Sequence, residues 1–243
     1  MSKKTFVIAG GSAGVAKQVV SELVKLGHNV VFGDLDVKSE LVENQLLSIR
    51  IDITSVSDCE RLFKLAYDNF GRIDGFFSYA GITPPQSLEE CTEELHDNIL
   101  DVNLKGALFC CKYAVKYMKQ SGGGSIVLTG SPHSDAGEID RVSYACSKGA
   151  IVTLANHIAK NYGKYNIRSN YITLGWTPTE GELSLRKKQG MSKEDLEKHA
   201  HKFIPMGRMN TYDDIVPAII YLLSDKSSMV SGSNIRITGG WFM

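Results

Sequence analysis

The segment Thr5-Phe-Val-Ile-Ala-Gly-Gly-Ser-Ala-Gly-Val-Ala16 decides the fold of this chain. Its first five residues, Thr5–Ala9, are apolar or β-branched and predict a short buried strand. The glycines that follow predict a tight turn, and we expect a helix to run from there to about Leu26. Glycines between a strand and a helix let the backbone approach a pyrophosphate that rests on the helix N-terminus. The segment is therefore typical of the first strand-turn-helix unit of a dinucleotide-binding fold.

Strand and helix patterns alternate along the rest of the chain. The further strands are expected at 29–33, 47–51, 74–79, 125–129, 166–174 and 234–238. The further helices, with apolar residues every three or four positions, are expected at about 55–70, 92–120, 143–162 and 211–223. Alternation of this kind predicts an α/β fold, a single-domain doubly wound parallel sheet (Rossmann fold) with helices on both faces. We expect residues 1–243 to form this one domain, with a substrate-binding loop or lid at about 177–209.

The composition limits the classes of function. The chain has 27 basic and 27 acidic residues and no long basic block, so we expect no nucleic-acid or membrane-surface partner. Its five cysteines are an odd number without a Cys-x-x-Cys pair, which favours reduced thiols in a cytoplasmic protein. No apolar stretch reaches the ~18 residues of a membrane span. The apolar run near the start is broken by Gly10 and Gly11, so we interpret it as a strand rather than a signal peptide.

An acidic residue follows the second predicted strand. Asp34 lies twenty residues after Gly14, where a carboxylate can accept hydrogen bonds from the adenosine ribose hydroxyls and would repel a 2′-phosphate. The neighbours that might otherwise neutralise a 2′-phosphate are not basic: Ser12, Ala13 and Leu35. We therefore expect NAD(H) as the cofactor. Asp36 and Lys38 follow closely, and NADP(H) remains the alternative.

Tyr144 and Lys148 are the candidate proton-transfer pair. They stand four residues apart on the helix predicted at 143–162, so their side chains share one face. A positive charge beside a tyrosine favours the phenolate and is expected to lower the tyrosine pKa. That suits a proton-transfer catalyst working near neutral pH. A tyrosine and a lysine at this spacing can arise by chance. The pair therefore counts as evidence for catalysis only together with the dinucleotide pattern and with Ser131 and Asn103 upstream.

Taken in order, these features resemble the short-chain dehydrogenase/reductase family over essentially the full length. The family's motifs fall on Ala9–Ala16, Asp52-Ile53, Ser78-Tyr-Ala-Gly81, Asn103, Ser131, Tyr144–Lys148, Leu174–Thr179, Ser231-Gly232 and Gly239-Gly240. Some positions depart from the family pattern: Ala9 replaces the turn threonine, Ala16 the last glycine, Ser78 and Tyr79 two asparagines, and Leu174 a proline. The four positions that match the family's catalytic residues are kept.

The resemblance implies an oxidoreductase that transfers a hydride between NAD(H) and a secondary alcohol or ketone. In it Tyr144 is the general acid/base, Lys148 lowers the Tyr144 pKa and bonds the nicotinamide ribose, and Ser131 polarises the reacting oxygen. Asn103 is expected to hold a water that extends a proton relay from Lys148. The residues expected to bind the cofactor are Gly10, Ser12, Ala13, Gly14, Val15, Asp34, Asp52, Ile53, Tyr79, Ala80, Gly81, Tyr144, Lys148, Thr177 and Thr179.

The substrate signal is weaker. Ligands meet such a sheet beyond the carboxyl ends of its strands, so the substrate candidates are Ser131, His133, Arg141 and Trp176. Arg141 and the basic run 186–188 hint at an anion, but acidic residues nearby favour a solvated charged face. The polar insert favours a small polar secondary alcohol or ketone. His199 and His201 lack a third ligand, so we expect no metal.

Two other functions remain open: an NADP(H)-dependent carbonyl reductase, and a non-catalytic dinucleotide-binding or sensing protein of the same fold. The family resemblance implies a homotetramer built through the helices at about 92–120 and 143–162, with a dimer as the alternative. Both helices are apolar over more than one face, as interface helices are.

Overall fold

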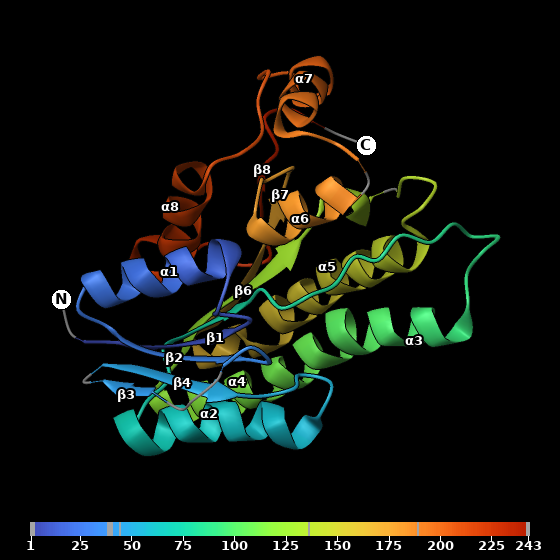
Figure 1. Cartoon of the computed structure of the whole chain (residues 1–243). Coiled ribbons are helices and arrows are strands. Elements are labelled where there is room, and N and C mark those ends of the chain that lie inside the picture. The colour runs from blue at the N-terminus through green and yellow to red at the C-terminus, as the bar shows by residue number, and fades with distance from the viewer. Residues whose placement is uncertain (1–2, 38–40, 44, 136, 189, 242–243) are drawn as a thin grey trace.

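The computed structural model describes residues 3–37, 41–43, 45–135, 137–188 and 190–241 (Figure 1). Within those residues the strands form one eight-stranded sheet in the order β3-β4-β2-β1-β5-β6-β7-β8. The strands are β1 (Thr5–Ala9), β2 (Asn29–Asp34), β3 (Leu41–Glu43), β4 (Leu46–Arg50), β5 (Gly75–Ser78), β6 (Gly124–Gly130), β7 (Ile167–Leu174) and β8 (Asn234–Ile237). All neighbours pair in parallel except β3, which pairs with β4 antiparallel at the sheet edge.

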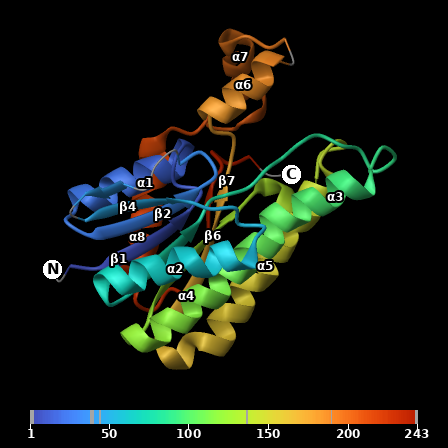
Figure 2. The ribbon, with the colours of Figure 1, turned by 60° about the horizontal axis from the view of Figure 1, so that its bottom comes forward.

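Helices cover both faces of this sheet. They are α1 (Gly14–Lys25), α2 (Val56–Phe70), α3 (Glu93–Leu100), α4 (Ala107–Ser121), α5 (Val142–Tyr162), α6 (Glu180–Lys188), α7 (Lys193–Phe203) and α8 (Tyr212–Leu223). One apolar cluster joins α1 and α8 to one face, and a second joins α2, α4 and α5 to the other (Figure 2). The doubly wound parallel sheet expected from the sequence is confirmed.

The order of the strands places a crevice at the middle of the sheet. The chain runs outward from β1 through β2 to β4, then crosses back to β5 and continues outward in the other direction. At this switch point the loops after β1 and β5 diverge to opposite faces, and ligands bind in the crevice between them. The glycine-rich turn follows β1, and Tyr79–Gly81 follows β5.

Three features differ from the sequence-based expectations. Strand β3 was not predicted, because three residues are too few to show a period. The helix expected at 92–120 is divided into α3 and α4 by a π-helical segment, Asp101–Gly106, which adds a residue to the turn without disturbing the apolar pattern. The stretch at 177–209 contains two helices, α6 and α7, above the carboxyl edge of the sheet (Figure 1).

Candidate active site

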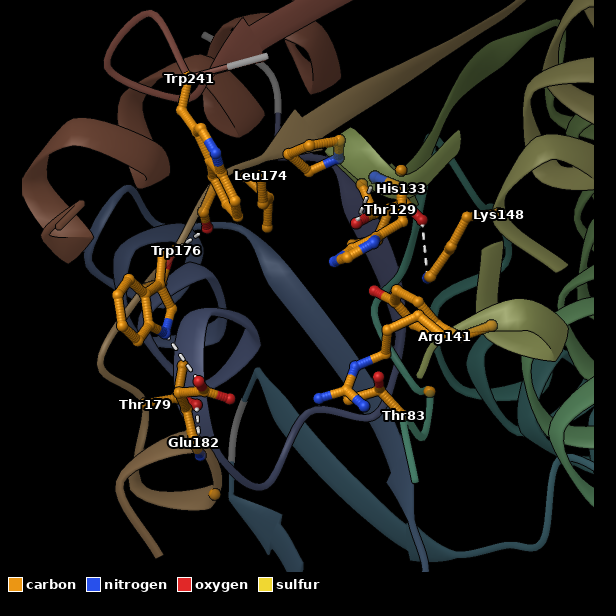
Figure 3. Close-up of a pocket in the computed structure, with 18 of the residues that line it drawn as sticks. Thr83, Thr129, His133, Arg141, Lys148, Leu174, Trp176, Thr179, Glu182 and Trp241 are labelled. Atoms are coloured by element: carbon orange, nitrogen blue, oxygen red, sulfur yellow. Dashed lines mark hydrogen bonds between the residues drawn. The ribbon is translucent and has the colours of Figure 1, made fainter. Parts of the chain in front are cut away.

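A cavity of about 660 Å³ lies beyond the carboxyl ends of the parallel strands (Figure 3). Its walls come from the loops after β5, β6 and β7, from the first turns of α5, and from α6 and α7. Ser131, Tyr144 and Lys148 all line it. The structure therefore brings three of the four predicted catalytic residues to one space, next to the helix that follows the glycine-rich turn.

The glycine-rich turn forms a cradle that side chains would fill. Gly10 has a φ of +87°, and a Cβ there would lie 2.6 Å from the backbone nitrogen of Ala80. Gly14 begins α1 with a φ of +56°, in the left-handed region that favours glycine. Ala13 precedes it and provides no side-chain cap, so N–H groups of the first turn point outward for an anion. These residues fit the pyrophosphate of a dinucleotide.

The Tyr79 hydroxyl lies in this cradle. A Cβ on Gly14 would come within 2.9 Å of the Tyr79 hydroxyl and 3.5 Å of the Thr179 methyl group. The backbone N–H of Val15 donates a hydrogen bond to this hydroxyl, but burial dominates and raises the Tyr79 pKa. The Tyr79 hydroxyl therefore uses the Val15 N–H, which would otherwise be free to bind an anion. The position of Tyr79 after β5 in the sequence did not reveal this role.

Asp34 is held beside the turn by Ser12. Its Oδ2 accepts hydrogen bonds from the Ser12 backbone N–H at 3.1 Å and the Ser12 hydroxyl at 2.6 Å. The backbone N–H of Asp36 lies 3.4 Å from the other carboxylate oxygen, Oδ1. The carboxylate thus stands at the end of β2, one strand away from the cradle, where an adenosine ribose is expected to lie. Lys38, which bears on the choice of cofactor, falls outside the described residues.

Asp52 and Ile53 follow β4 on the far side of Asp34 from the turn. The Asp52 carboxylate accepts from the backbone N–H of Thr54 at 2.9 Å and from its hydroxyl at 2.8 Å. The Ile53 side chain packs against Gly106, where a Cβ would come within 2.8 Å of it. Both residues lie outside the walls of the cavity, and any contact with a dinucleotide would be at its adenine end.

Ser131, Tyr144 and Lys148 approach one another from two elements. Ser131 follows β6, and its side chain hydrogen-bonds with the Tyr144 phenol from the first turn of α5. One turn further along α5, the Lys148 amine lies 5.6 Å from the centre of the Tyr144 ring. It donates to the carbonyl oxygen of Thr129 at 2.9 Å, as the dashed line in Figure 3 shows. Lys148 is only 5% exposed.

Asn103 lies in the π-helical segment, behind this group. Its Nδ2 donates to the Ile82 carbonyl at 2.9 Å and to the Ser147 hydroxyl at 3.1 Å, and its Oδ1 accepts from the Ile82 N–H at 2.8 Å. A Cβ on Gly81 would lie 3.1 Å from Asn103 Oδ1 and 3.8 Å from Lys148 Nζ. Both amide protons are therefore used, and Oδ1 accepts one hydrogen bond among the described residues.

The pKa of Tyr144 differs from the expectation. Burial raises it, and the effects that oppose burial come from the Ser131 hydrogen bond and the Arg141 guanidinium rather than from Lys148. Burial also lowers the pKa of Lys148 to about 8, so this amine loses its charge more readily than an exposed lysine. The expected lowering of the Tyr144 pKa is not found in this structure, because burial raises that pKa and Lys148 is not among the groups that oppose the effect.

The substrate candidates also line the cavity. The His133 ring lies edge-on to the Tyr144 ring, with centroids 5.6 Å apart, and burial lowers the His133 pKa. Arg141 immediately precedes α5, and its guanidinium points into the cavity (Figure 3). The Trp176 indole donates to Glu182 at 2.7 Å across the start of the insert. Thr177 and Thr179, expected at the cofactor, lie on the same wall.

Several wall residues were missed by sequence reasoning. Glu182 was counted only as a surface charge, but it accepts from Trp176 and from Arg186, both at 2.7 Å. Trp241 also contributes to the wall, and the pair of aromatic residues after Gly239-Gly240 was the available signal in the sequence. The ring of His199, which was considered as a possible metal ligand, lies edge-on to Trp176 and tilted against Phe203, with ring centroids 5.5 and 4.3 Å away.

No helix in the described part of the chain combines the length and hydropathy that crossing a membrane requires. Likewise, the described residues contain no group of three or more histidine, cysteine, aspartate or glutamate side chains placed to hold a metal ion.

A hydroxyl, a phenol and an amine beside a dinucleotide turn can move a proton while a hydride leaves carbon, which is oxidoreductase chemistry. Comparison with known proteins agrees. A family model described as Enoyl-(Acyl carrier protein) reductase matches residues 9–242. An uncharacterized oxidoreductase of Thermotoga maritima is 33% identical over 98% of this chain and 96% of its own length. An NAD-dependent glycerol dehydrogenase of Listeria innocua is 29% identical, over 99% and 94% respectively.

A solved structure gives the same result. A short chain dehydrogenase family protein from Francisella tularensis superposes with a TM-score of 0.89 at 29% identity, covering 99% of both chains. The chain belongs to the short-chain dehydrogenase/reductase family, which binds a nicotinamide dinucleotide. It is an oxidoreductase that acts on alcohol or ketone groups.

Proposed function

We propose that this protein is an NAD(H)-dependent oxidoreductase that interconverts a small polar secondary alcohol and the corresponding ketone. The observation that carries the proposal is the cavity itself, in which Ser131, Tyr144 and Lys148 stand next to α1 and its glycine-rich turn. Residues 1–243 act as one domain, with 177–209 as the substrate-binding lid. A cytoplasmic location is consistent with the free cysteines among the described residues.

Tyr144 is the general acid/base in this proposal. The bound nicotinamide supplies the hydride acceptor or donor, and the chain's own residues handle the proton and the developing charge. Ser131 donates a hydrogen bond to the reacting oxygen, and Tyr144 takes the proton from the alcohol or returns it to the ketone. Lys148, when protonated, stabilises the phenolate and bonds the nicotinamide ribose. Asn103 holds the water through which the proton reaches solvent.

The cofactor assignment rests on Asp34. Its carboxylate, fixed by the Ser12 backbone and hydroxyl, stands where an NADP 2′-phosphate would suffer charge repulsion. The name of the Listeria innocua relative, an NAD-dependent glycerol dehydrogenase, supports both NAD and a small polar substrate. The polar groups around Trp176 and Glu182 support the same size and polarity of substrate.

The test is a screen of secondary alcohols with NAD⁺ and with NADP⁺, followed by the absorbance of the reduced nicotinamide. We expect turnover with NAD⁺ and a much weaker response to NADP⁺. A strong NADP⁺ preference would contradict the role of Asp34. Replacing Tyr144 with Phe is expected to lower kcat by roughly 10²- to 10⁴-fold while the cofactor still binds. Turnover that survived this substitution on a confirmed substrate would exclude Tyr144 as the acid/base.

A further inference from the structure

Arg141 is a buried cation in the wall of the catalytic cavity. The residue is 5% exposed and stands at the N-terminal boundary of α5, three positions before Tyr144. Its guanidinium lies in the cavity on the opposite side from Trp176 and Glu182 (Figure 3). An arginine is rarely buried unless its charge is paired, so its partners decide what it does.

Only one nitrogen of this guanidinium is used within the described residues. Nη1 donates to the Asp140 carbonyl at 2.9 Å and to the Asp140 carboxylate at 2.7 Å. Nε and Nη2 have no acceptor in the described part of the chain. The Asp140 carboxylate is 42% exposed, so it offsets the arginine charge only weakly. A planar edge with two N–H donors is thus left for a ligand, and carboxylates match that geometry.

Several other ionisable side chains of the cavity are engaged elsewhere, whereas Glu138 is an exposed acid on its wall. Glu182 accepts from Trp176 and pairs with Arg186, and Lys148 donates to the Thr129 carbonyl. His133 has a lowered pKa because of burial, so it is neutral near pH 7. Arg141 is therefore the cation beside Tyr144 that retains free donors among the described residues.

A second donor faces the same space. Thr83 lines the cavity, and its hydroxyl has no hydrogen-bond partner among the described residues. Its loop is held to the segment before α5, because the backbone N–H of Gln86 donates to the Asp140 carbonyl at 2.9 Å and Gln86 pairs with Arg141 in an isolated bridge. Both Thr83 and Arg141 line the cavity (Figure 3). Two donors on neighbouring segments can bind both oxygens of one carboxylate.

We propose that the substrate is a short hydroxy acid, or the oxo acid derived from it, whose carboxylate binds Arg141 and Thr83. The proposal rests on the proposed function of the same cavity. Arg141 immediately precedes α5, and its guanidinium shares the cavity with the Tyr144 phenol and acts on it electrostatically, so a carboxylate bound there lies close to the reacting carbon. In oxidation the C–H bond breaks as a hydride that the oxidised dinucleotide accepts, the O–H proton passes to Tyr144, and a C=O bond forms.

The first test compares short 2-, 3- and 4-hydroxy acids with their methyl esters, which differ in the charge that Arg141 would bind. We expect kcat/KM for at least one acid to exceed that of its ester by tenfold or more. In Arg141→Gln, the acid-to-ester ratio is expected to fall by roughly 10- to 100-fold, the effect of losing a hydrogen-bonded charge. The matched control is Arg61→Gln, an exposed arginine of α2 outside the cavity walls, which should leave the ratio close to that of the wild type.

The second readout does not depend on turnover. The chain has two tryptophans, Trp176 and Trp241, and both line this cavity, so their fluorescence reports a ligand bound there. With NAD⁺ present, propionate is expected to bind the wild-type protein at least about tenfold more tightly than propionamide, and Arg141→Gln should remove the difference. Equal binding of the two compounds would overturn the proposal even if no substrate were known.

The remaining outcomes separate this inference from the proposed function. If the neutral alcohols and esters react but the acid-to-ester ratio is the same in Arg141→Gln, the oxidoreductase assignment stands and Arg141 serves only to hold Asp140. The third class of test substrate is a phosphorylated alcohol such as glycerol 3-phosphate. A preference for it over every carboxylate would overturn the carboxylate assignment. Absence of turnover with any alcohol and either dinucleotide would instead contradict the proposed function.

Discussion

Tyr79 shows how one side chain can compete with a ligand. The Val15 N–H at the start of α1 is oriented for an anion, and it donates to the Tyr79 phenol in the structure. A pyrophosphate in the cradle has to displace this hydroxyl. The sequence revealed only that a tyrosine replaces an asparagine after β5, because a tyrosine can reach the α1 N-terminus only in a particular rotamer.

We expect Tyr79→Phe to bind NAD⁺ more tightly than the wild type, by roughly two- to tenfold, because a single neutral hydrogen bond no longer has to be broken. Isothermal titration calorimetry measures the Kd directly. Tyr212→Phe is the matched control, since Tyr212 belongs to the same apolar cluster but lies outside the walls of the cavity. Weaker binding in Tyr79→Phe would mean that the phenol bonds the pyrophosphate instead of competing with it.

Burial of the Lys148 amine lowers the stability of the folded protein when this amine is charged. Its pKa in the folded protein is about 8, below the ordinary value of 10.5, because burial disfavours the charged form. Between those two pH values the unfolded chain binds more protons than the native protein, so the contribution of this residue to stability increases as the pH rises. Below about pH 8 the protein must keep an ammonium ion in a desolvated place.

The substitution Lys148→Met removes that buried charge. We expect its free energy of unfolding at pH 7 to exceed the wild-type value by up to about 3 kcal/mol, less the loss of the bond to the Thr129 carbonyl. At pH 10 the difference is expected to fall below about 1 kcal/mol, because the wild-type lysine is then largely neutral. Urea unfolding at the two pH values measures both numbers. A difference that does not depend on pH would show that the charge is not the cause.

At the residue scale, the sequence predicted which side chains meet but not how their environment acts. Ser131, Tyr144 and Lys148 gather in one cavity, as their order and elements indicated. The direction of the Tyr144 pKa was wrong because burial is a property of the packed structure, and no spacing along the chain contains it. Arg141 was undervalued for the same reason: a sequence does not show which nitrogens of a guanidinium lack an acceptor.

At the scale of elements, long periodic segments were predictable and short or strained ones were not. The core strands and α1, α2, α5 and α8 have the apolar periods and boundary residues from which they were predicted, such as Ser55 before α2 and Gly71 after it. The π-helical segment gives no periodic signal, yet it places Asn103 where the amide holds the loop at Ile82. Helices α6 and α7 are polar, so their pattern suggested only a lid.

One partly buried acidic residue anchors α6. Glu182 joins α6 to the segment after β7 by accepting from the Trp176 indole, and it also pairs with Arg186 one turn later. Glu182→Ala is expected to raise the amide hydrogen-exchange rates of α6 by roughly 10- to 100-fold, while the core strands exchange as before. The exposed Glu194 on α7 provides the matched alanine control. Equal protection of α6 in the two variants would show that the contacts of Glu182 do not hold this helix.

At the scale of the whole molecule, the topology was the most predictable property. Strand-helix alternation with right-handed crossovers leaves few arrangements, and the crevice at the switch point then fixes where a ligand meets the chain. Assembly is different, because it depends on which outer faces remain uncovered. Leu108 on α4 is 42% exposed, and Phe109 beside it and Leu154 on α5 are only partly buried. A second copy packed on these helices would cover those side chains.

We expect the protein to be a homotetramer in which α4 and α5 of one chain pack against those of another. Multi-angle light scattering should then give a mass four times that of the single chain. The alternative, a dimer, would give twice that mass. Leu108→Arg places a charge in the proposed contact and is expected to reduce the mass, because an unpaired charge is not tolerated in a buried apolar interface. Leu26→Arg is the matched control, since Leu26 is 51% exposed at the end of α1, away from both helices. A monomeric wild-type protein, or a Leu108→Arg variant that stays tetrameric, would exclude this interface.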